Sequence, residues 1–423
     1  MDIAETTRSP VQLAADLADA ARSAQRVLAR LSAMQKGAAL VQAAAALRAD
    51  EATILSANAR DMAAGEGAGL SPAMLDRLRL DSARLVAIAD AVEQVARLPD
   101  PVGSVIDTSE RPNGLNLSRI RVPIGVIAII YESRPNVTAD AAALCVRSGN
   151  AAILRGGSEA VHSNRALHAA FVRGLEQGGI PAAAAQLVPD QDRAVVGALL
   201  TASGQIDMII PRGGKSLVER VQADARVPVL AHLDGICHTY LHHAADPAMA
   251  QAVAVNAKLR RTGICGAMET LLIDARFEAA QQVCAALIDA GCELRGDTRA
   301  CALDPRIGAA AAEDWDTEYL EPILSVAVVD GIDAAMDHIA LHGSGHTEAI
   351  VTQDQSAAER FLAEVDSAIV MVNASTQFAD GGEFGLGAEI GIATGRLHAR
   401  GPVALEGLTT YKWQVRGTGQ IRP

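Results

Sequence analysis

A cysteine with small neighbours stands out among the residues that could do chemistry. Cys265 lies in "RTGICGAMET" (261–270), where Gly263 and Gly266 flank it between a helix-like run and an apolar run. Glycines remove bulk from around a side chain and let backbone or ligand come close. Most free cysteines are instead buried small hydrophobes. A nucleophilic role also needs a positive neighbour or a helix terminus, because an ordinary cysteine is only about 3% thiolate at pH 7.

Two turns of the same design follow apolar runs. "ILRGGSEA" (153–160) and "IIPRGGKS" (209–216) each place Arg-Gly-Gly after an expected strand and before an expected helix. The helix N-terminus attracts anions, and Arg155, Arg212 and Lys215 add full positive charges, so a phosphate or ribose would fit there. Tight strand-to-helix turns favour glycine in any case. Neither turn is a GxGxxG or a GxxxxGK[ST] motif.

An asparagine follows the first of the buried runs. In "YESRPNVT" (131–138), a polar cluster that contains Asn136 follows six apolar residues. Ligand crevices in open α/β sheets lie beyond the carboxyl ends of the strands. The amide of Asn136 is therefore a candidate donor to a developing oxyanion, and the alternative is that it caps the next helix.

The histidines offer weaker patterns. "HGSGH" (342–346) lacks the glutamate of HExxH and is broken by glycine, which predicts a solvated loop. The pair His242 and His243 is expected in a surface turn, and His238 is a partner for Cys265 if the protein is a thiol hydrolase. No metal site is expected.

The elements that position these residues follow from periodicity. Residues 10–98 show helical spacing, with Leu13, Leu17 and Leu28 on one face of the first helix, and Ser71 and Pro72 open a later one. Beyond residue 125 short apolar runs alternate with helical stretches, which predicts parallel sheets covered by helices. The predicted strands are "GVIAIIYE", "AAILR", "AQLVP" and "IDMIIP", then "TLLID", "LSVAVVD", "TEAIVT" and "AIVMVN".

Two α/β domains are therefore expected, with Cys265 near their junction. Residues 105–122 contain a Pro-Asn-Gly turn between extended stretches, which predicts a hairpin. The C-terminal stretch 406–423 is also strand-like. Together these segments predict an arm that pairs with another subunit.

Composition limits the class of protein. The 423 residues are 50% hydrophobic, and no apolar run approaches the roughly 18 to 20 residues of a membrane helix. The N-terminus lacks the features of a secretion signal, so a cytoplasmic location is expected. A net charge of −13 argues against nucleic-acid and anionic-membrane partners. The six cysteines contain no CxxC pair, which argues against disulfides and structural zinc.

Longer segments resemble a known family. "GVIAIIYESRPNVTADAAALCVRSGNAAILRGG", "HLDGICHTYL", "ICGAMETLL" and the block from "VNASTQFADGG" to "LTTYKW" resemble the γ-glutamyl phosphate reductases, a branch of the aldehyde dehydrogenase superfamily. Relatives in that family often carry proline shortly before the cysteine and asparagine just after it, where this chain has Thr262, Gly263 and Gly266. The resemblance implies an aldehyde-dehydrogenase-like fold of two doubly wound α/β domains and a β-hairpin oligomerisation arm.

The resemblance also implies roles for individual residues. Cys265 corresponds to the nucleophile and Asn136 to the oxyanion donor, and "HLDGICH" stands where hydrolytic relatives carry a water-activating glutamate. An NADP-binding domain is implied for 1–104 and 123–232 with a return segment near 382–405, a catalytic domain for 233–381, and the arm for 105–122 and 406–423. The residues implied for NADP(H) binding are Ser133, Arg134, Pro135, Arg155, Gly156, Gly157, Ser158, Arg212, Gly213, Gly214, Lys215 and Glu318.

The implied reaction is NADPH-dependent reduction of L-glutamyl 5-phosphate to L-glutamate 5-semialdehyde, through a thioester, in proline biosynthesis. A homo-oligomer is expected, and glutamate 5-kinase is a candidate partner because the acyl phosphate is labile. Three alternatives remain open at this point: a hydrolytic aldehyde dehydrogenase on a related semialdehyde, a thiol acyltransferase or hydrolase, and a non-enzymatic partner of the kinase.

Overall fold

The computed structural model describes residues 9–422, which form two compact units. Unit 1 contains the described residues as far as Ala231, together with Leu386–Gly391 and residues 403–422. Unit 2 contains His232–Gly385 and Ile392–Pro402. Of the return segment expected near 382–405, residues 386–391 and 403–405 therefore group with unit 1, and the remainder groups with unit 2.

Unit 1 begins with helices, as the spacing predicts. Ser71 caps α4 by accepting the N–H of Met74, with Pro72 in the first turn. The buried face of α1 is lined by alanines and by Leu28, as predicted for the latter, whereas Leu13 and Leu17 are only half-buried. The helices are α1 (Pro10–Leu28), α2 (Ala33–Ala49), α3 (Glu51–Gly67), α4 (Pro72–Leu78) and α5 (Ser82–Arg97).

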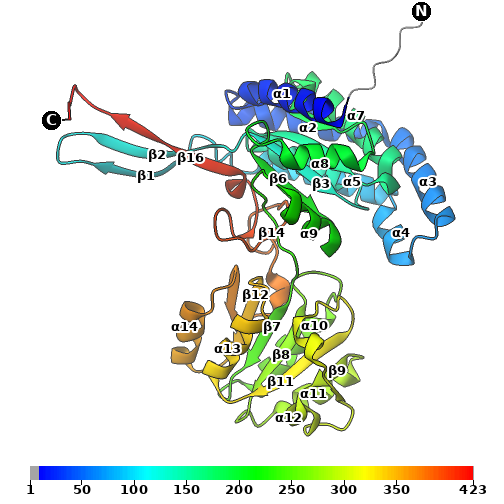
Figure 1. Cartoon of the computed structure of the whole chain (residues 1–423), viewed down its shortest axis with the longest axis vertical. Coiled ribbons are helices and arrows are strands. Elements are labelled where there is room, and N and C mark those ends of the chain that lie inside the picture. The colour runs from blue at the N-terminus through cyan, green and yellow to red at the C-terminus, as the bar shows by residue number, and fades with distance from the viewer. Residues whose placement is uncertain (1–8, 423) are drawn as a thin grey trace, which may run out of the picture. The chain divides into compact units, whose positions relative to one another are not determined.

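A four-stranded parallel sheet forms the core of unit 1, in the order β5-β4-β3-β6. Its strands β3 and β4 are almost wholly buried, which explains their continuous apolar sequence. Helices alternate with the strands along the chain (Figure 1). The elements are β3 (Val126–Tyr131), α6 (Val137–Arg147), β4 (Ala151–Gly156), α7 (Val161–Gln177), β5 (Ala185–Leu187), α8 (Arg193–Thr201), β6 (Met208–Arg212) and α9 (Lys215–Asp224).

The predicted hairpin and C-terminal strand pair with each other. β1 (Val105–Glu110), β2 (Asn116–Pro123) and β16 (Thr409–Arg416) form an antiparallel ribbon in the order β1-β2-β16 (Figure 1). All of β1 and most of β16 are exposed. Arg119 lies over the rings of Tyr411 and Trp413 at 5.2 and 5.6 Å, which ties β2 to β16.

Unit 2 is built on a seven-stranded parallel sheet in the order β10-β9-β11-β8-β7-β12-β13. Its core is aliphatic, with Leu271, Ile273 and Val326 fully buried. The elements are β7 (Cys237–Leu241), α10 (Pro247–Leu259), β8 (Met268–Asp274), α11 (Ala280–Asp289), β9 (Glu293–Gly296), α12 (Thr298–Cys301), β10 (Gly308–Ala309), β11 (Ile323–Val329), α13 (Ile332–His342), β12 (Thr347–Val351), α14 (Gln355–Glu364) and β13 (Ile369–Val372). A short pair, β14 (Ile392–Ala393) and β15 (Gly401–Pro402), completes the unit.

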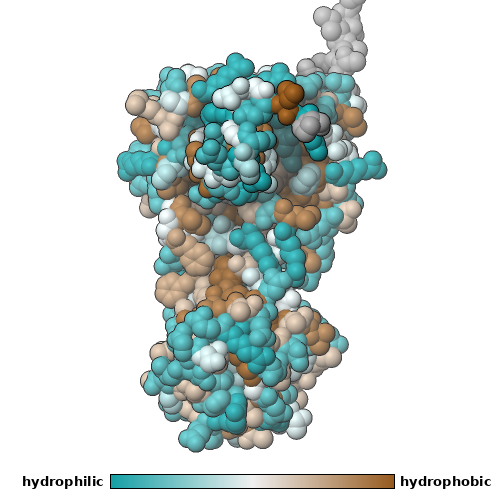
Figure 2. Space-filling view, turned by 90° about the vertical axis from the view of Figure 1, so that its left-hand side faces the viewer, coloured by the Kyte–Doolittle hydropathy of each residue, from teal (hydrophilic) through white to brown (hydrophobic). Residues whose placement is uncertain are grey.

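Hydrophilic residues predominate on the face of unit 2 that Figure 2 shows. None of the helices in the described part of the chain combines the length and hydrophobicity that crossing a bilayer requires.

Candidate active site

The loop that carries Cys265 is held by contacts at its start and at Cys265 itself. It joins α10 to β8. Gln377 donates through Nε2 to the carbonyl oxygens of Ala257, at 2.8 Å, and Arg261, at 3.1 Å. The segment before β7 packs so closely on the loop that a Cβ added at Gly235 would lie 2.3 Å from the carbonyl oxygen of Cys265. The backbone around the sulfur is therefore fixed by contacts, and Gly235 is the residue that permits this approach.

Replacing Gly235 with alanine tests this packing. The added Cβ must displace the Cys265 backbone, and misplacement of a reacting group by about 1 Å costs up to about 100-fold in rate. We expect kcat to fall about tenfold with little change in the binding of cofactor. Steady-state kinetics would measure the loss.

The matched control for that substitution is Gly197→Ala, because nothing lies within 4 Å of a Cβ built at this position in α8. It should leave kcat unchanged and stabilise the fold slightly. Equal activity of the two alanine variants would contradict a fixed loop.

Cys265 differs from most of the other cysteines in its exposure. Cys145, Cys284 and Cys292 are buried, and burial raises the pKa of each thiol to about 12, so these three groups stay protonated. Cys237 is also fully buried, and its Sγ donates to the carbonyl oxygen of Cys265 at 3.1 Å. Among the described cysteines, only Cys265 and Cys301 are partly exposed.

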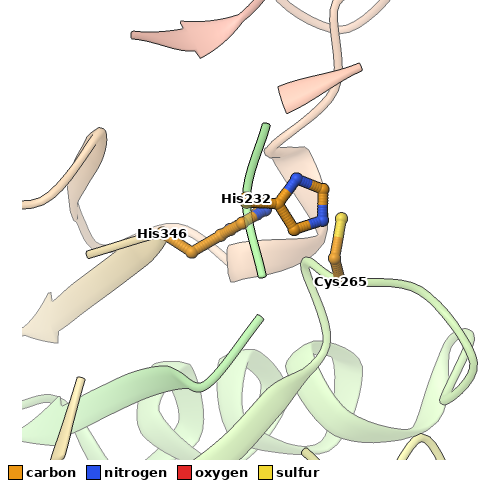
Figure 3. Close-up of side chains that lie close together, drawn as sticks. All are labelled: His232, Cys265 and His346. Carbon is orange, nitrogen blue, oxygen red and sulfur yellow. The ribbon is translucent and has the colours of Figure 1, made fainter. Parts of the chain in front are cut away.

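Two histidines lie close to the Cys265 sulfur on the same side of it. His232 precedes β7 and His346 precedes β12, and Figure 3 shows the ring of His232 beside the sulfur with His346 behind it. Nδ1 of His232 lies 2.7 Å from the carbonyl oxygen of Ile392, which leaves Nε2 for other contacts. One ligand atom from each of the three side chains lies within 4.8 Å of the others. We name these three residues the thiol–imidazole cluster.

His346 is the unexpected member of the thiol–imidazole cluster. The motif "HGSGH" predicts a solvated loop, but His346 is 0% exposed, so this prediction was wrong for it. Burial and the neighbouring His232 lower the pKa of His346 to about 3, so its imidazole is neutral. Nδ1 lies 2.9 Å from Oγ1 of Thr347, whereas Nε2 has no hydrogen-bond partner among the residues described.

The predictions made for His242 and His238 also differ from the structure. His242 is buried at 4% exposure, where a surface turn was expected, although its neighbour His243 is exposed. His238 was the candidate partner of Cys265 in a thiol hydrolase. It is fully buried, and both its N–H and its Nδ1 contact Oε2 of Glu348, at 2.9 and 3.0 Å. The imidazole beside the sulfur is that of His232 instead.

Asn136 occupies the N-cap position, immediately before α6, but its side chain makes no capping hydrogen bond. Its Nδ2 donates instead to Oδ2 of Asp140 at 2.8 Å. Burial raises the pKa of Asp140 to about 6. The alternative that the Asn136 side chain caps the helix is thus wrong. The side-chain amide is instead held by the carboxylate of Asp140, four residues further along the chain. Asn136 belongs to unit 1 and Cys265 to unit 2.

The three predicted cofactor turns of unit 1 meet at one edge of its sheet. Tyr131 at the end of β3 pairs with Gly156 on β4 and with Arg212 on β6, so residues 133–136, 155–158 and 212–215 follow neighbouring strand ends. Ser133 has a φ of +43° and donates through Oγ to Glu159 Oε1 at 2.9 Å. Arg134 is exposed and Pro135 is buried.

Two glutamates fill part of the space that the glycines leave. A Cβ at Gly157 would lie 2.2 Å from Glu159, and a Cβ at Gly213 would lie 2.5 Å from Glu132. The N–H of Gly214 donates to Glu132 at 3.2 Å. These glycines therefore admit carboxylates of the chain itself against the turns. From the sequence, the glycines were expected either to let an anionic ligand approach or simply to allow a tight strand-to-helix turn.

Arg155 is held by backbone rather than by an acid. It donates to the carbonyl oxygens of Gly156 at 3.0 Å and of Gln191 at 2.9 Å. Arg212 packs over Gly391, where a Cβ would lie 2.5 Å from its Nη1. Both guanidinium groups thus contact backbone at the edge of the sheet, and Ser158 and Lys215 begin the helical segments that follow the two turns.

Glu318 lies in unit 2, in the segment before β11. The next residue but one, Leu320, has a φ of +56° and donates its N–H to Oε1 of Glu269 at 3.3 Å. Glu269 in turn accepts from Nζ of Lys258 at 2.5 Å, and both side chains are 0% exposed. Burial raises the pKa of Glu269 to about 7.

The Lys258–Glu269 pair therefore closes the base of the Cys265 loop and anchors the segment that carries Glu318. Sequence reasoning missed the pair. Its only signal was two opposite charges, one in α10 and one in β8, within otherwise apolar stretches.

Comparisons with known proteins cover most of the chain and agree on one family. The family model of the aldehyde dehydrogenase family matches residues 2–314. A γ-glutamyl phosphate reductase of Novosphingobium aromaticivorans is 73% identical, over 98% of each chain. One of Sphingopyxis alaskensis is 69% identical, over 97% of this chain and 96% of the relative. The crystal structure of a γ-glutamyl phosphate reductase from Thermotoga maritima superposes with a TM-score of 0.95 at 40% identity, over 97% and 100% of the two chains.

Proposed function

Because the chain belongs to the aldehyde dehydrogenase family, within its γ-glutamyl phosphate reductase branch, we propose that it reduces L-glutamyl 5-phosphate to L-glutamate 5-semialdehyde and phosphate, with NADPH. It is an oxidoreductase with the aldehyde dehydrogenase fold, and members of this family use a nicotinamide cofactor. The observation that carries the proposal for this chain is the partly exposed thiol of Cys265 beside the imidazole of His232.

Cys265 is proposed as the nucleophile. Its thiolate attacks the acyl carbon, the S–C bond forms, and the C–O bond to phosphate breaks, which leaves a thioester. Nε2 of His232 is the proposed acceptor of the thiol proton, since the Nδ1 position is bound to the Ile392 carbonyl. The amide of Asn136 and the N–H of Cys265 are proposed to hold the oxyanion.

The cofactor site is proposed at the sheet edge of unit 1. Arg155, Arg212 and Lys215 lie at strand ends or helix starts there, which suits the phosphates of a dinucleotide. The proposed members of this site are also Ser133, Arg134, Pro135, Gly156, Gly157, Ser158, Gly213 and Gly214, with Glu318 from unit 2. When bound, reduced nicotinamide would supply the hydride that converts the thioester to the aldehyde level. Cys265 holds the acyl group during this step and then releases it.

Phosphate dependence tests the reaction class. We expect oxidation of L-glutamate 5-semialdehyde by NADP⁺ to continue only when phosphate is present, because the acyl group on Cys265 needs an acceptor. Absorbance of the reduced nicotinamide measures the rate, and NAD⁺ in place of NADP⁺ measures cofactor preference. Continuous turnover without phosphate would indicate a hydrolytic aldehyde dehydrogenase. No absorbance change with either cofactor would indicate a thiol hydrolase or acyltransferase.

Assembly is a further part of the proposal. Val105, Trp413 and Val415 are more than half exposed on the β1–β2–β16 ribbon. We propose that this ribbon pairs with a second copy of the chain and that glutamate 5-kinase is a partner that passes on the labile acyl phosphate. Light scattering of the chain with and without residues 406–423 would test the first point.

A further inference from the structure

The thiol–imidazole cluster of Cys265, His232 and His346 has the donor set of a metal site. It offers one sulfur and two imidazole nitrogens, and one ligand atom of each residue lies within 4.8 Å of the others. Thiolate and imidazole together are the ligands that Zn²⁺ prefers. From the sequence no metal site was expected, because "HGSGH" is broken by glycine and lacks the glutamate of HExxH.

We propose that this cluster binds Zn²⁺ through Sγ of Cys265 and Nε2 of His232 and His346, and that the bound ion blocks the nucleophile. Binding rests on the geometry alone, whereas the inhibitory effect rests on the proposed function. The ion would thus act as a reversible inhibitor that is removed by chelators.

The second contacts of both imidazoles support this assignment. A histidine that binds a metal typically uses its other ring nitrogen to contact a carbonyl or another oxygen, which fixes the ring. Nδ1 of His232 contacts the Ile392 carbonyl oxygen at 2.7 Å, and Nδ1 of His346 contacts Thr347 Oγ1 at 2.9 Å. In both rings the other nitrogen, Nε2, is therefore the atom that would bind the ion.

Burial of His346 is the independent observation that points to a ligand. The side chain is 0% exposed, yet its Nε2 has no hydrogen-bond partner in the described part of the chain. A buried polar atom without a partner costs about 1–3 kcal/mol. Figure 3 shows this ring on the far side of His232 from Cys265, within the same group. A bound cation would satisfy the nitrogen.

The dimensions are compatible with one ion. With Zn–S near 2.3 Å and Zn–N near 2.0–2.1 Å, the ligand atoms of a tetrahedral site lie within about 4 Å of one another. The three ligand atoms lie within 4.8 Å of one another, so binding of an ion would draw them together by about 1 Å at most. Three protein ligands leave a fourth position for water, and partial exposure of Cys265 gives the ion a route in.

Cobalt absorption provides a test that does not depend on activity. The full chain, stripped with a chelator, is titrated with Co²⁺. We expect a thiolate-to-cobalt charge-transfer band and the intense visible bands of tetrahedral Co²⁺, both removed by stoichiometric Zn²⁺. Cys265→Ser should lose the charge-transfer band, and His346→Gln should weaken Co²⁺ and Zn²⁺ binding at least about tenfold. His342→Gln, a change in the same motif outside the cluster, should bind both ions as the unchanged chain does.

Inhibition of the reductase by Zn²⁺ provides a second test. Zn²⁺ should inhibit the reductase reversibly, and the concentration for half inhibition should rise at least about tenfold in His346→Gln but not in His342→Gln. If His346→Gln does not fold, by circular dichroism, His232→Asn replaces it in the cobalt titration.

Absence of the charge-transfer band in the unchanged chain would overturn the proposal, as would equal Zn²⁺ affinity in His346→Gln. If the chain gives the charge-transfer band but shows no reductase activity, the metal site would stand and the proposed function would be rejected.

Discussion

Cys265→Ser is expected to abolish reduction of L-glutamyl 5-phosphate, with residual turnover at the limit of detection. A serine hydroxyl in the same place is far less ionised at neutral pH than a thiol, and the thiolate is the attacking species. The substitution removes little volume, so the thermal unfolding midpoint should stay within a few degrees of that of the unchanged chain. Steady-state assays in both directions would measure the loss.

Cys301→Ser is the matched control, because Cys301 is the other partly exposed cysteine of the described chain. Its Sγ contacts the carbonyl oxygens of Gly296 and Gly308, and we expect full activity after this change. Phosphate-dependent oxidation at a near-normal rate in Cys265→Ser would show that the reaction does not proceed through a covalent bond to this residue.

Asn136→Ala is expected to lower kcat by about 100- to 1,000-fold, the usual cost of removing one oxyanion donor. KM for the acyl phosphate should change far less, because the donor acts on charge that develops in the transition state. The helix should survive, since the Asn136 side chain makes no capping hydrogen bond in α6.

Asn136→Asp tests whether the loss comes from the missing hydrogen-bond donor or from the smaller side chain. It keeps the shape but replaces the amide N–H with an acceptor, and it places a second carboxylate beside Asp140. We expect a loss at least as large as that of the alanine variant. If Asn136→Asp retains normal kcat, Asn136 does not donate to the oxyanion.

Both sheets could be predicted from the sequence because most of their strands are buried on both faces. The run "GVIAIIYE" is strand β3, and "TLLID" and "LSVAVVD" lie in β8 and β11 of the second sheet. Strand β7 was missed because "CHTYL" carries polar residues in a central position. Two of its polar side chains are paired in the interior, with His238 Nδ1 on Glu348 and the Tyr240 hydroxyl on Asp274.

The central residue of the candidate site was also predictable, because glycines on both sides of Cys265 are a local signal. The partners of Cys265 were not, since His232 and His346 reach it only when two strands of the second sheet have formed. The sequence around His346 even predicted the wrong environment, because its glycine neighbours indicated a solvent-exposed loop. The buried Lys258–Glu269 pair shows the same limit, because each charge is unfavourable inside a core until the other is present.

Trapping of the acyl group on the protein tests the central claim most directly. L-Glutamate 5-semialdehyde and NADP⁺ are mixed with the chain in the absence of phosphate, the reaction is stopped with acid, and tryptic peptides are weighed by mass spectrometry. We predict one equivalent of reduced cofactor per chain and one glutamyl group on peptide 262–276, whose only cysteine is Cys265. Reduced cofactor without a glutamyl group on this peptide, or with the group on another peptide, would contradict the account.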